Sequence, residues 1–253
     1  MMRFTPQMRA LSWLVDRPIA HRGLHKVEAG LVENTAGAFA AAIAGNYAIE
    51  CDLQITADGE AVVFHDETLE RVTTSQGWVK SHTVKQLHGI AYRHGKDRMQ
   101  TLGELLDQVG GRVPLIIELK SHWDGDDHLT LRALRVLEHY KGPHALMSFD
   151  PDMVAQMAEF SPRTVRGITA DRATDSYYNM LPVPRRLEMQ RFSHLARTRP
   201  HFASFYFRDL PFAPVQAFRA AGQPLITWTI RSEEQARLAR RYSDQITFEG
   251  YSA

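Results

Sequence analysis

The chain has 253 residues, of which 44% are hydrophobic and 23% are charged. These proportions are ordinary for a globular protein and exclude a disordered or fibrous chain. The formal net charge is +1, so no overall field favours nucleic acid or an anionic membrane as a partner, and an anionic ligand must be recognised locally. A single cysteine, Cys51, excludes an internal disulfide and is expected to be a small packed residue.

The segment Met1–Asp16 carries Arg3 and Arg9 and one short apolar group, Leu11–Val15. This group is too short and too interrupted for the apolar region of a signal peptide, and no later run approaches the length of a membrane span. We therefore expect a cytoplasmic protein with no stable membrane anchor.

Short apolar runs then alternate with segments whose apolar residues recur at helical spacing. The predicted strands are Pro18–Ala20, Ala48–Ile55, Ala61–Phe64, Val113–Leu119, His144–Phe149, Thr164–Ile168, Phe202–Phe207, Pro224–Ile230 and Gln245–Phe248. The predicted helices are Thr35–Ala44, Leu102–Val109, Leu129–His139, Pro151–Glu159, Phe212–Ala220 and Ser232–Arg240. Strand alternating with helix indicates a parallel sheet covered on both faces, and the length of the chain fits one (β/α)8 TIM barrel.

Two stretches interrupt this alternation. Residues from about 67 to 100 are polar and rich in turn formers, and we interpret them as a small insertion after the second strand. Residues from about 171 to 200 hold several arginines around a predicted helical centre, Arg185–Arg197. Predicted helix caps are Asn34 or Thr35, Asp150 and Ser232, and predicted helix ends are Gly45, Gly110 and Gly222. No linker divides the chain, so we predict a single domain, residues 1–253.

The first candidate site is the tripeptide His21-Arg22-Gly23, at the end of the first strand. Ligands of parallel α/β proteins bind where strands end, and a guanidinium beside a flexible glycine is suited to an anion. Taken alone, the tripeptide is better explained as a capped strand end with a solvent-facing arginine.

Acidic residues on the next two strands strengthen the case for a site. Glu50 and Asp52 lie two apart on one strand, so both carboxylates point to the same face. Glu118 ends the following apolar run, and Lys120 shares its face. Buried like charges need a compensating cation, and an all-oxygen site suits Mg²⁺ or Ca²⁺. Solvated acids on an edge strand are the weaker explanation, because the flanking residues are apolar.

A second histidine, His65, follows the run Ala61–Phe64. Asp58-Gly59 is a turn signal, so this run is expected to form a hairpin with the end of the second strand. The hairpin would return His65 toward the carboxylates. Either histidine alone is better explained as structural, whereas two histidines beside strand ends that also supply acids favour catalysis.

These motifs together resemble the glycerophosphodiester phosphodiesterase family. The matching motifs are His21-Arg22-Gly23, Glu33-Asn34-Thr35, Glu50-x-Asp52, Thr56-x-Asp58-Gly59, His65-Asp66-x-x-Leu69-x-Arg71, Thr101-Leu102-x-Glu104-Leu105-Leu106 and Glu118-x-Lys120. The resemblance is firm from about residue 18 to residue 120. Weaker matches follow at Ser148-Phe149-Asp150 and Trp228-Thr229-Ile230.

The resemblance implies a (β/α)8 barrel that hydrolyses glycerophosphodiesters to sn-glycerol 3-phosphate and an alcohol such as choline or ethanolamine. It implies that Glu50, Asp52 and Glu118 bind the metal, that His21 and His65 act as base and acid, and that Arg22 and Lys120 bind phosphate. Asn34 matches a position near the metal site. Trp228 is a candidate substrate contact, with a core tryptophan as the alternative.

The chain departs from the family pattern at two places. Arg231 stands where family members often have Asn, and Thr247-Phe248-Glu249 replaces the usual Thr-Asp. The expected partner is a small-molecule phosphodiester substrate; the head group, the metal and the oligomeric state stay open. Alternative functions are a lysophospholipase D-like hydrolase of lipid phosphodiesters, which the basic and aromatic 177–199 stretch would suit, and an inert barrel that binds phosphorylated ligands.

Overall fold

The computed structural model describes residues 10–253, which fall into two compact units. The N-terminal unit comprises residues 19–120 and 126–146, and the C-terminal unit comprises the described residues up to Pro18 with residues 121–125 and 147–253. The prediction of a single domain stays a prediction. The prediction for Met1–Asp16 falls in large part on residues 1–9, which lie outside the described residues.

The N-terminal unit is built around one long strand that is buried along nearly its whole length. β2 (Ala48–Ile55) pairs in parallel with β1 (Ile19–Ala20) and with β4 (Leu115–Leu119). Only the last residue of β2 is not buried, which suits a strand covered on both faces. The register places Asp52 opposite Glu118 and Ile19 opposite Ala48. Strand register therefore brings acids that are far apart in sequence to one edge.

The predicted hairpin is confirmed. β3 (Ala61–Val63) is antiparallel to the end of β2, with Leu53 opposite Val63. Its turn is fastened by the Thr56 hydroxyl, which donates to Asp58 at 2.7 Å, and Gly59 adopts a left-handed φ of 77°. After β3, the amide of Phe64 donates to the carbonyl of Asp52 at 3.0 Å. The chain thus carries His65 back to the level of the carboxylates.

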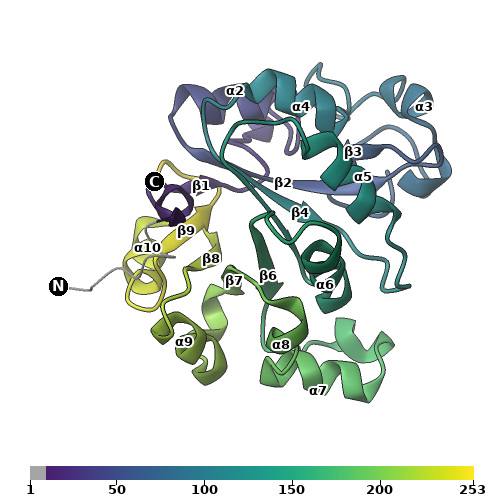
Figure 1. The fold of residues 1–253 in the computed structure, drawn as a ribbon. Coiled ribbons are helices and arrows are strands. Elements are labelled where there is room, and N and C mark those ends of the chain that lie inside the picture. Colours follow the sequence, from purple (N-terminus) through teal and green to yellow (C-terminus); the bar gives the residue numbers. More distant parts are fainter. Residues whose placement is uncertain (1–9) are drawn as a thin grey trace. The chain divides into compact units, whose positions relative to one another are not determined.

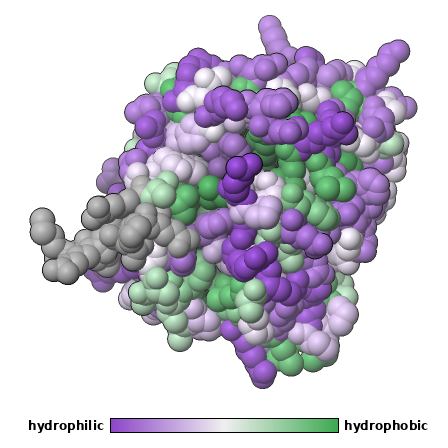
Figure 2. All heavy atoms as spheres, viewed as in Figure 1, coloured by the Kyte–Doolittle hydropathy of each residue, from purple (hydrophilic) through white to green (hydrophobic). Residues whose placement is uncertain are grey.

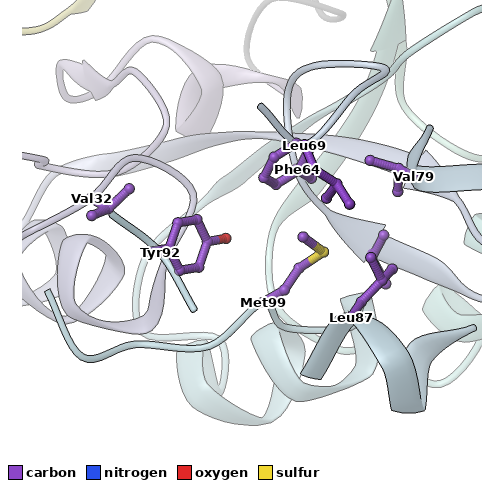
Figure 3. Close-up of a cluster of buried hydrophobic side chains, with 8 residues drawn as sticks. Val32, Phe64, Leu69, Val79, Leu87, Tyr92 and Met99 are labelled. Atoms are coloured by element: carbon purple, nitrogen blue, oxygen red, sulfur yellow. The ribbon is translucent and has the colours of Figure 1, made fainter. Parts of the chain in front are cut away.

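The insertion at residues 67–100 packs onto the rest of the N-terminal unit through a buried apolar cluster. It contains a 3-10 helix, η3 (Val79–Ser81), and α3 (Val84–His88), which begins with a capping box of Thr83 and Gln86. Figure 3 shows the buried side chains that gather here: Val32, Phe64, Leu69, Val79, Leu87, Tyr92 and Met99. A polar, turn-rich sequence therefore still folds, because most of its apolar residues join a cluster that Val32, Val62 and Phe64 complete from outside the insertion. Trp78 is an exception and is 46% exposed.

Helices of the N-terminal unit begin and end close to the predicted positions. They are α2 (Ala36–Ala44), α4 (Leu102–Val109) and α5 (His128–Leu137), and Figure 1 shows α2 and α4 side by side. α4 has a capping box of Thr101 and Glu104 and ends at Gly110 in the left-handed region. Thr35 precedes α2 as predicted, but its side chain does not cap the helix; its hydroxyl donates to the carbonyl of Val32.

The C-terminal unit repeats the alternation of strand and helix. β6 (Arg166–Ala170), β7 (Phe202–Tyr206), β8 (Leu225–Ile230) and β9 (Gln245–Phe248) pair in parallel in that order. Its helices include α6 (Pro151–Phe160), α9 (Ala213–Ala220) and α10 (Glu233–Ala239). Asp150 caps α6 and Ser232 caps α10 as predicted. β5 (His144–Ser148) begins in the N-terminal unit and ends in the C-terminal one.

One helix prediction in this unit was wrong. The expected helical centre Arg185–Arg197 is two helices, α7 (Val183–Arg191) and α8 (Leu195–Thr198), preceded by a 3-10 helix, η4 (Ser176–Met180). The break falls at Phe192, whose φ of 55° ends α7. Phe192 is buried against Phe205 and Phe212, so packing of its ring offsets the strain of a left-handed backbone.

The surface of the described residues is mixed. Figure 2 shows hydrophobic residues in patches among hydrophilic ones on the visible face. Among residues 10–253, no helix combines the length and the apolar character that crossing a membrane requires.

We predict that Leu87→Ala lowers the free energy of unfolding by about 2–5 kcal/mol, because it opens a cavity in the buried cluster of the insertion. Leu131→Ala is the matched control, since Leu131 also lies on a helix of the N-terminal unit but is 44% exposed. Urea denaturation followed by circular dichroism measures both. Equal losses would mean that the insertion does not contribute to the cooperative core.

Candidate metal and phosphate site

Three carboxylates of the N-terminal unit converge. Glu50 and Asp52 point to one face of β2, and the β2–β4 register adds Glu118 to the same place. One carboxylate oxygen from each of the three lies within 4.8 Å of the others. The side chains are only 2%, 1% and 5% exposed. The structure therefore brings together the three predicted metal ligands.

Burial of these acids has an electrostatic consequence. Burial, together with the charges of Asp52 and Glu118, raises the pKa of Glu50 well above its usual range. Burial would also raise the pKa of Asp52, but Lys120, His65 and Arg22 outweigh it and hold that pKa below its ordinary value. A hard cation, bound by oxygen ligands, would relieve the repulsion that Glu50 experiences. The donor set of this site thus fits Mg²⁺ or Ca²⁺.

Two basic side chains flank the carboxylates. The Lys120 ammonium contacts Glu118 and lies 2.9 Å from Asp52. Burial would lower the pKa of Lys120, but these two carboxylates more than reverse that effect, so the amine stays charged. The Arg22 guanidinium lies 3.5 Å from Asp52, measured from Nε to Oδ2. Lys120 and Arg22 therefore place positive charge beside the carboxylates, where it could bind a phosphate group.

The turn after β1 explains the order His-Arg-Gly. Arg22 and Gly23 both have left-handed φ angles, 54° and 79°. A Cβ on Gly23 would lie 2.9 Å from the backbone of Ala38, so no larger residue fits. The amide of Arg22 donates to Glu50 Oε2 at 2.9 Å, and the amide of Gly23 donates to the Glu50 carbonyl at 3.2 Å. This turn fixes Arg22 and Glu50 to each other.

Asn34 lies beside the acids, as the resemblance implied. Its side-chain amide donates to Asp52 Oδ2 at 2.8 Å, and its own oxygen accepts from the Asp52 amide at 3.3 Å. Asn34 is 1% exposed and has a φ of 56°, a conformation that asparagine tolerates better than most residues. Asn34 therefore orients Asp52 rather than capping α2.

Both candidate histidines lie in the N-terminal unit. His21 Nε2 is 3.9 Å from Glu50 Oε2. His65 Nδ1 is 2.6 Å from Asp66 Oδ1, and the charge of His65 acts on Asp52. A carboxylate at Nδ1 selects the tautomer with its proton there and leaves Nε2 for proton exchange. His21 thus lies beside the carboxylate of Glu50, whereas the His65 ring is held by Asp66.

Glu33, Asp66 and Arg71 lie within the motifs of the sequence, but no role was predicted for them. Arg71 bridges the two acids, and each acid in turn contacts a predicted site residue. The signal that could have found them was their occurrence in the same motifs as Arg22 and His65. Spacing alone does not connect residues 33 and 71.

Trp228 lies on β8 in the C-terminal unit. Its indole nitrogen donates to the carbonyl of Ser204 at 3.1 Å, and its ring packs against Phe149 and Tyr206. In the same unit, the two departures from the family pattern contact each other. Arg231 donates to Glu249 at 2.8 Å. The two replacements thus form one ion pair.

Comparison with known proteins extends these observations. An Oleispira antarctica phosphodiesterase, solved in complex with the product sn-glycerol-3-phosphate, is similar with a TM-score of 0.78 at 20% identity, covering 95% of this chain and 96% of that one. A Thermotoga maritima glycerophosphodiester phosphodiesterase is similar with a TM-score of 0.69 at 23% identity, covering 91% and 92%. The predicted fold class, a (β/α)8 barrel, is confirmed.

Sequence comparison identifies the family. A glycerophosphodiester phosphodiesterase of Caldanaerobacter subterraneus is 28% identical over 240 residues, which cover 90% of this chain and 91% of that protein. The sequence model of the glycerophosphoryl diester phosphodiesterase family matches residues 21–245. The chain therefore belongs to the glycerophosphoryl diester phosphodiesterase family, and the expected resemblance is confirmed.

We predict a pH-dependent contribution of Glu33 to stability. Burial would raise its pKa, but hydrogen bonds and charges of Arg71 and Arg22 lower it from 4.5 to about 2. Because the folded-state pKa is lowered, the stabilisation, on the order of 3 kcal/mol, is present above about pH 4.5 and is lost as the pH falls toward 2.

Urea denaturation of the wild type and Glu33→Gln from pH 7 to about pH 3 tests this contribution. The difference in unfolding free energy should be largest near neutrality and should shrink in acid. Glu28→Gln, at an exposed position of the same unit, controls for the loss of one negative charge. A difference that does not change with pH would contradict the assignment.

Proposed function

We propose that the chain hydrolyses glycerophosphodiesters to sn-glycerol 3-phosphate and an alcohol in a reaction that depends on a divalent cation. In this proposal Glu50, Asp52 and Glu118 bind Mg²⁺ or Ca²⁺, Arg22 and Lys120 bind the phosphate, and His21 and His65 transfer protons. Trp228 is proposed as a contact of the glycerol or the leaving group. Family membership and the product bound to the Oleispira relative support the substrate class.

The observation that carries this proposal is the composition of the carboxylate cluster. Three acids within 4.8 Å, nearly inaccessible to solvent, are unfavourable unless cations are bound among them. Lys120 and Arg22 lie mainly beside Asp52 and Glu118, while the pKa of Glu50 remains raised by burial and by its acidic neighbours. A divalent cation with an open coordination position would complete the charge balance and attract an anionic ester.

Each side chain then has a definite task. A phosphodiester resists attack because its anion repels nucleophiles and its alkoxide leaves poorly. When bound, the divalent cation supplies electrostatic stabilisation of the phosphate and acidifies the attacking hydroxyl. Arg22 offers a planar guanidinium that suits two phosphate oxygens, whereas Lys120 offers a point charge. Both stay protonated throughout.

The histidines supply the proton transfers. We assign His21, 3.9 Å from Glu50, as the base that accepts the proton of the attacking hydroxyl. We assign His65 as the acid that protonates the departing alcohol: it would enter this step as the imidazolium and give up the proton on Nε2, while the proton on Nδ1 stays hydrogen-bonded to Asp66. An inert phosphate-binding barrel has no need of such a pair.

The deciding experiment is an assay of glycerol 3-phosphate release from glycerophosphocholine by the full chain, with EDTA, with Mg²⁺ and with Ca²⁺. Release that requires a divalent cation supports the proposal. Phosphate binding without release would indicate the inert barrel. Release of choline and lysophosphatidic acid from lysophosphatidylcholine, with no cleavage of glycerophosphocholine, would indicate the lysophospholipase D-like alternative.

We predict that Glu118→Gln lowers turnover and weakens cation binding by orders of magnitude with little effect on the fold, because it removes one charge from an oxygen site at constant volume. Isothermal titration with Mg²⁺ and circular dichroism measure binding and fold separately from activity. The exposed Glu28→Gln should bind the cation as the wild type does. Full activity of Glu118→Gln, or of the EDTA-treated wild type, would overturn the metal assignment.

Arg22→Lys should be damaging although it keeps the charge. A lysine cannot make the two parallel hydrogen bonds that a guanidinium makes to phosphate, so kcat/KM should fall by about tenfold or more. Arg98→Lys is the control, because Arg98 also pairs with an acid, Glu104, but lies away from the proposed ligands. Steady-state kinetics with glycerophosphocholine distinguish the two variants. Wild-type kinetics for Arg22→Lys would make Arg22 a bystander.

The nucleophile is proposed to be the 2-hydroxyl of the substrate's own glycerol, which gives a cyclic phosphate that water then opens. An internal nucleophile gains the advantage of an intramolecular reaction, worth roughly 7–11 kcal/mol in well-oriented cases. Two histidines can run acid and base roles forward for ring closure and reversed for ring opening. A 2-deoxy analogue should therefore bind with similar affinity and fail to turn over. Cleavage of the analogue at the rate of the natural diester would identify water as the direct nucleophile.

A further inference from the structure

Arg71 makes an unusual number of contacts for a half-exposed side chain. Its Nη1 and Nη2 donate to the two oxygens of Glu33 at 2.9 and 2.6 Å. Its Nε and Nη2 donate to the two oxygens of Asp66 at 2.5 and 3.0 Å. One guanidinium thus holds two carboxylates through four hydrogen bonds, which only a planar, forked donor can do.

Each of these carboxylates holds a second side chain. Glu33 Oε1 accepts from Arg22 Nη1 at 2.7 Å. Asp66 Oδ1 lies 2.6 Å from His65 Nδ1. The chain of contacts therefore runs from the arginine of the first strand end, through Arg71, to the histidine of the hairpin. These residues all belong to the N-terminal unit.

We infer that Arg71 is a positioning residue that couples the phosphate-binding arginine, Arg22, to the proton-transferring histidine, His65, through Glu33 and Asp66. This inference rests on the proposed function for the roles of Arg22 and His65. Arg71 itself contacts neither the carboxylate cluster nor, in this proposal, the substrate.

The geometry restricts both functional side chains. Arg22 is held at Nη1 by Glu33 while its Nε faces Asp52 at 3.5 Å, so the plane of its guanidinium is set from two sides. His65 is held at Nδ1 by Asp66, whose second oxygen is engaged by Arg71. Without Arg71, Asp66 would be free to turn away, and the ring would lose its tautomer and its orientation.

Arg71 is more exposed to solvent than the two carboxylates that it holds. The Arg71 side chain is 46% exposed, whereas Glu33 is 15% and Asp66 is 22% exposed. Two acids held close together would repel each other without the cation between them. Because Arg71 also lowers the pKa of Glu33, its loss is expected to cost stability, and a purely structural Arg71 would show itself in unfolding rather than in the turnover of the folded enzyme. A positioning Arg71 would affect turnover as well.

The test compares Arg71→Met and Arg71→Lys with Arg98→Met. Arg98 is a matched control, because it is 52% exposed, lies in the same unit and donates to Glu104 at 2.6 Å. With glycerophosphocholine and Mg²⁺, at a temperature well below the thermal midpoint of every variant, Arg71→Met should lower kcat by roughly 10–100-fold and raise KM, whereas Arg98→Met should keep wild-type kinetics. Arg71→Met is also expected to lower the thermal midpoint more than Arg98→Met, because Arg71 stabilises the ionised form of Glu33. Arg71→Lys should not restore kcat, because an ammonium cannot hold both carboxylates.

A double-mutant cycle separates coupling from general damage. Arg71→Met combined with Asp66→Asn should lose much less activity than the product of the two single losses, because both act through the same ring of His65. Multiplicative losses, or wild-type kcat and KM in Arg71→Met, would overturn the inference.

A spectroscopic readout keeps this test independent of the proposed function. Nitrogen-15 NMR of the histidine rings, with His65 assigned by His65→Gln, reports which ring nitrogen carries the proton. The wild type should show His65 predominantly protonated at Nδ1, and Arg71→Met should shift it toward a mixture. If the wild type released no glycerol 3-phosphate, the proposed function would fail while this tautomer shift still supported the coupling; an unchanged tautomer in Arg71→Met would overturn the coupling itself.

Discussion

The constraint on which the site depends is the burial of like charges on one strand. Glu50 and Asp52 lie on the same face of β2, in surroundings that exclude water, and Glu118 joins them through strand register. Carboxylates in such a place are tolerable only with positive charge nearby. Arg22 and Lys120 supply this positive charge, and the side-chain amide of Asn34 adds a hydrogen bond to Asp52. Much of the local structure thus stabilises the three buried carboxylates.

The two carboxylates of β2 differ in their electrostatic surroundings. Asp52 contacts Lys120, Arg22 and Asn34, and its pKa is lowered. The Glu50 carboxylate accepts a hydrogen bond from the Arg22 amide and lies 3.9 Å from His21 Nε2, and its pKa remains raised. A cluster of identical groups is therefore electrostatically uneven. A bound divalent cation would reduce this difference, because it would offset the repulsion that raises the pKa of Glu50.

Sequence patterns predicted the strands well because buried parallel strands are near-continuous apolar runs, as β4 and β8 illustrate. The period of two in a strand placed Glu50 with Asp52, and the hairpin signal placed His65. The break at Phe192 was not predictable, because a left-handed phenylalanine is stabilised by rings that arrive from distant segments. Likewise, Glu33 and Arg71 are 38 residues apart, and no local sequence pattern indicates that their side chains form a hydrogen bond.

The pairing of Arg231 with Glu249 turns two departures from the family pattern into one change. Each residue directly follows one of two neighbouring parallel strands of the C-terminal unit, β8 and β9. Because the Arg231 side chain is 57% exposed, this pair is expected to add little to stability, so the two departures alter the charge pattern at this strand end rather than the fold.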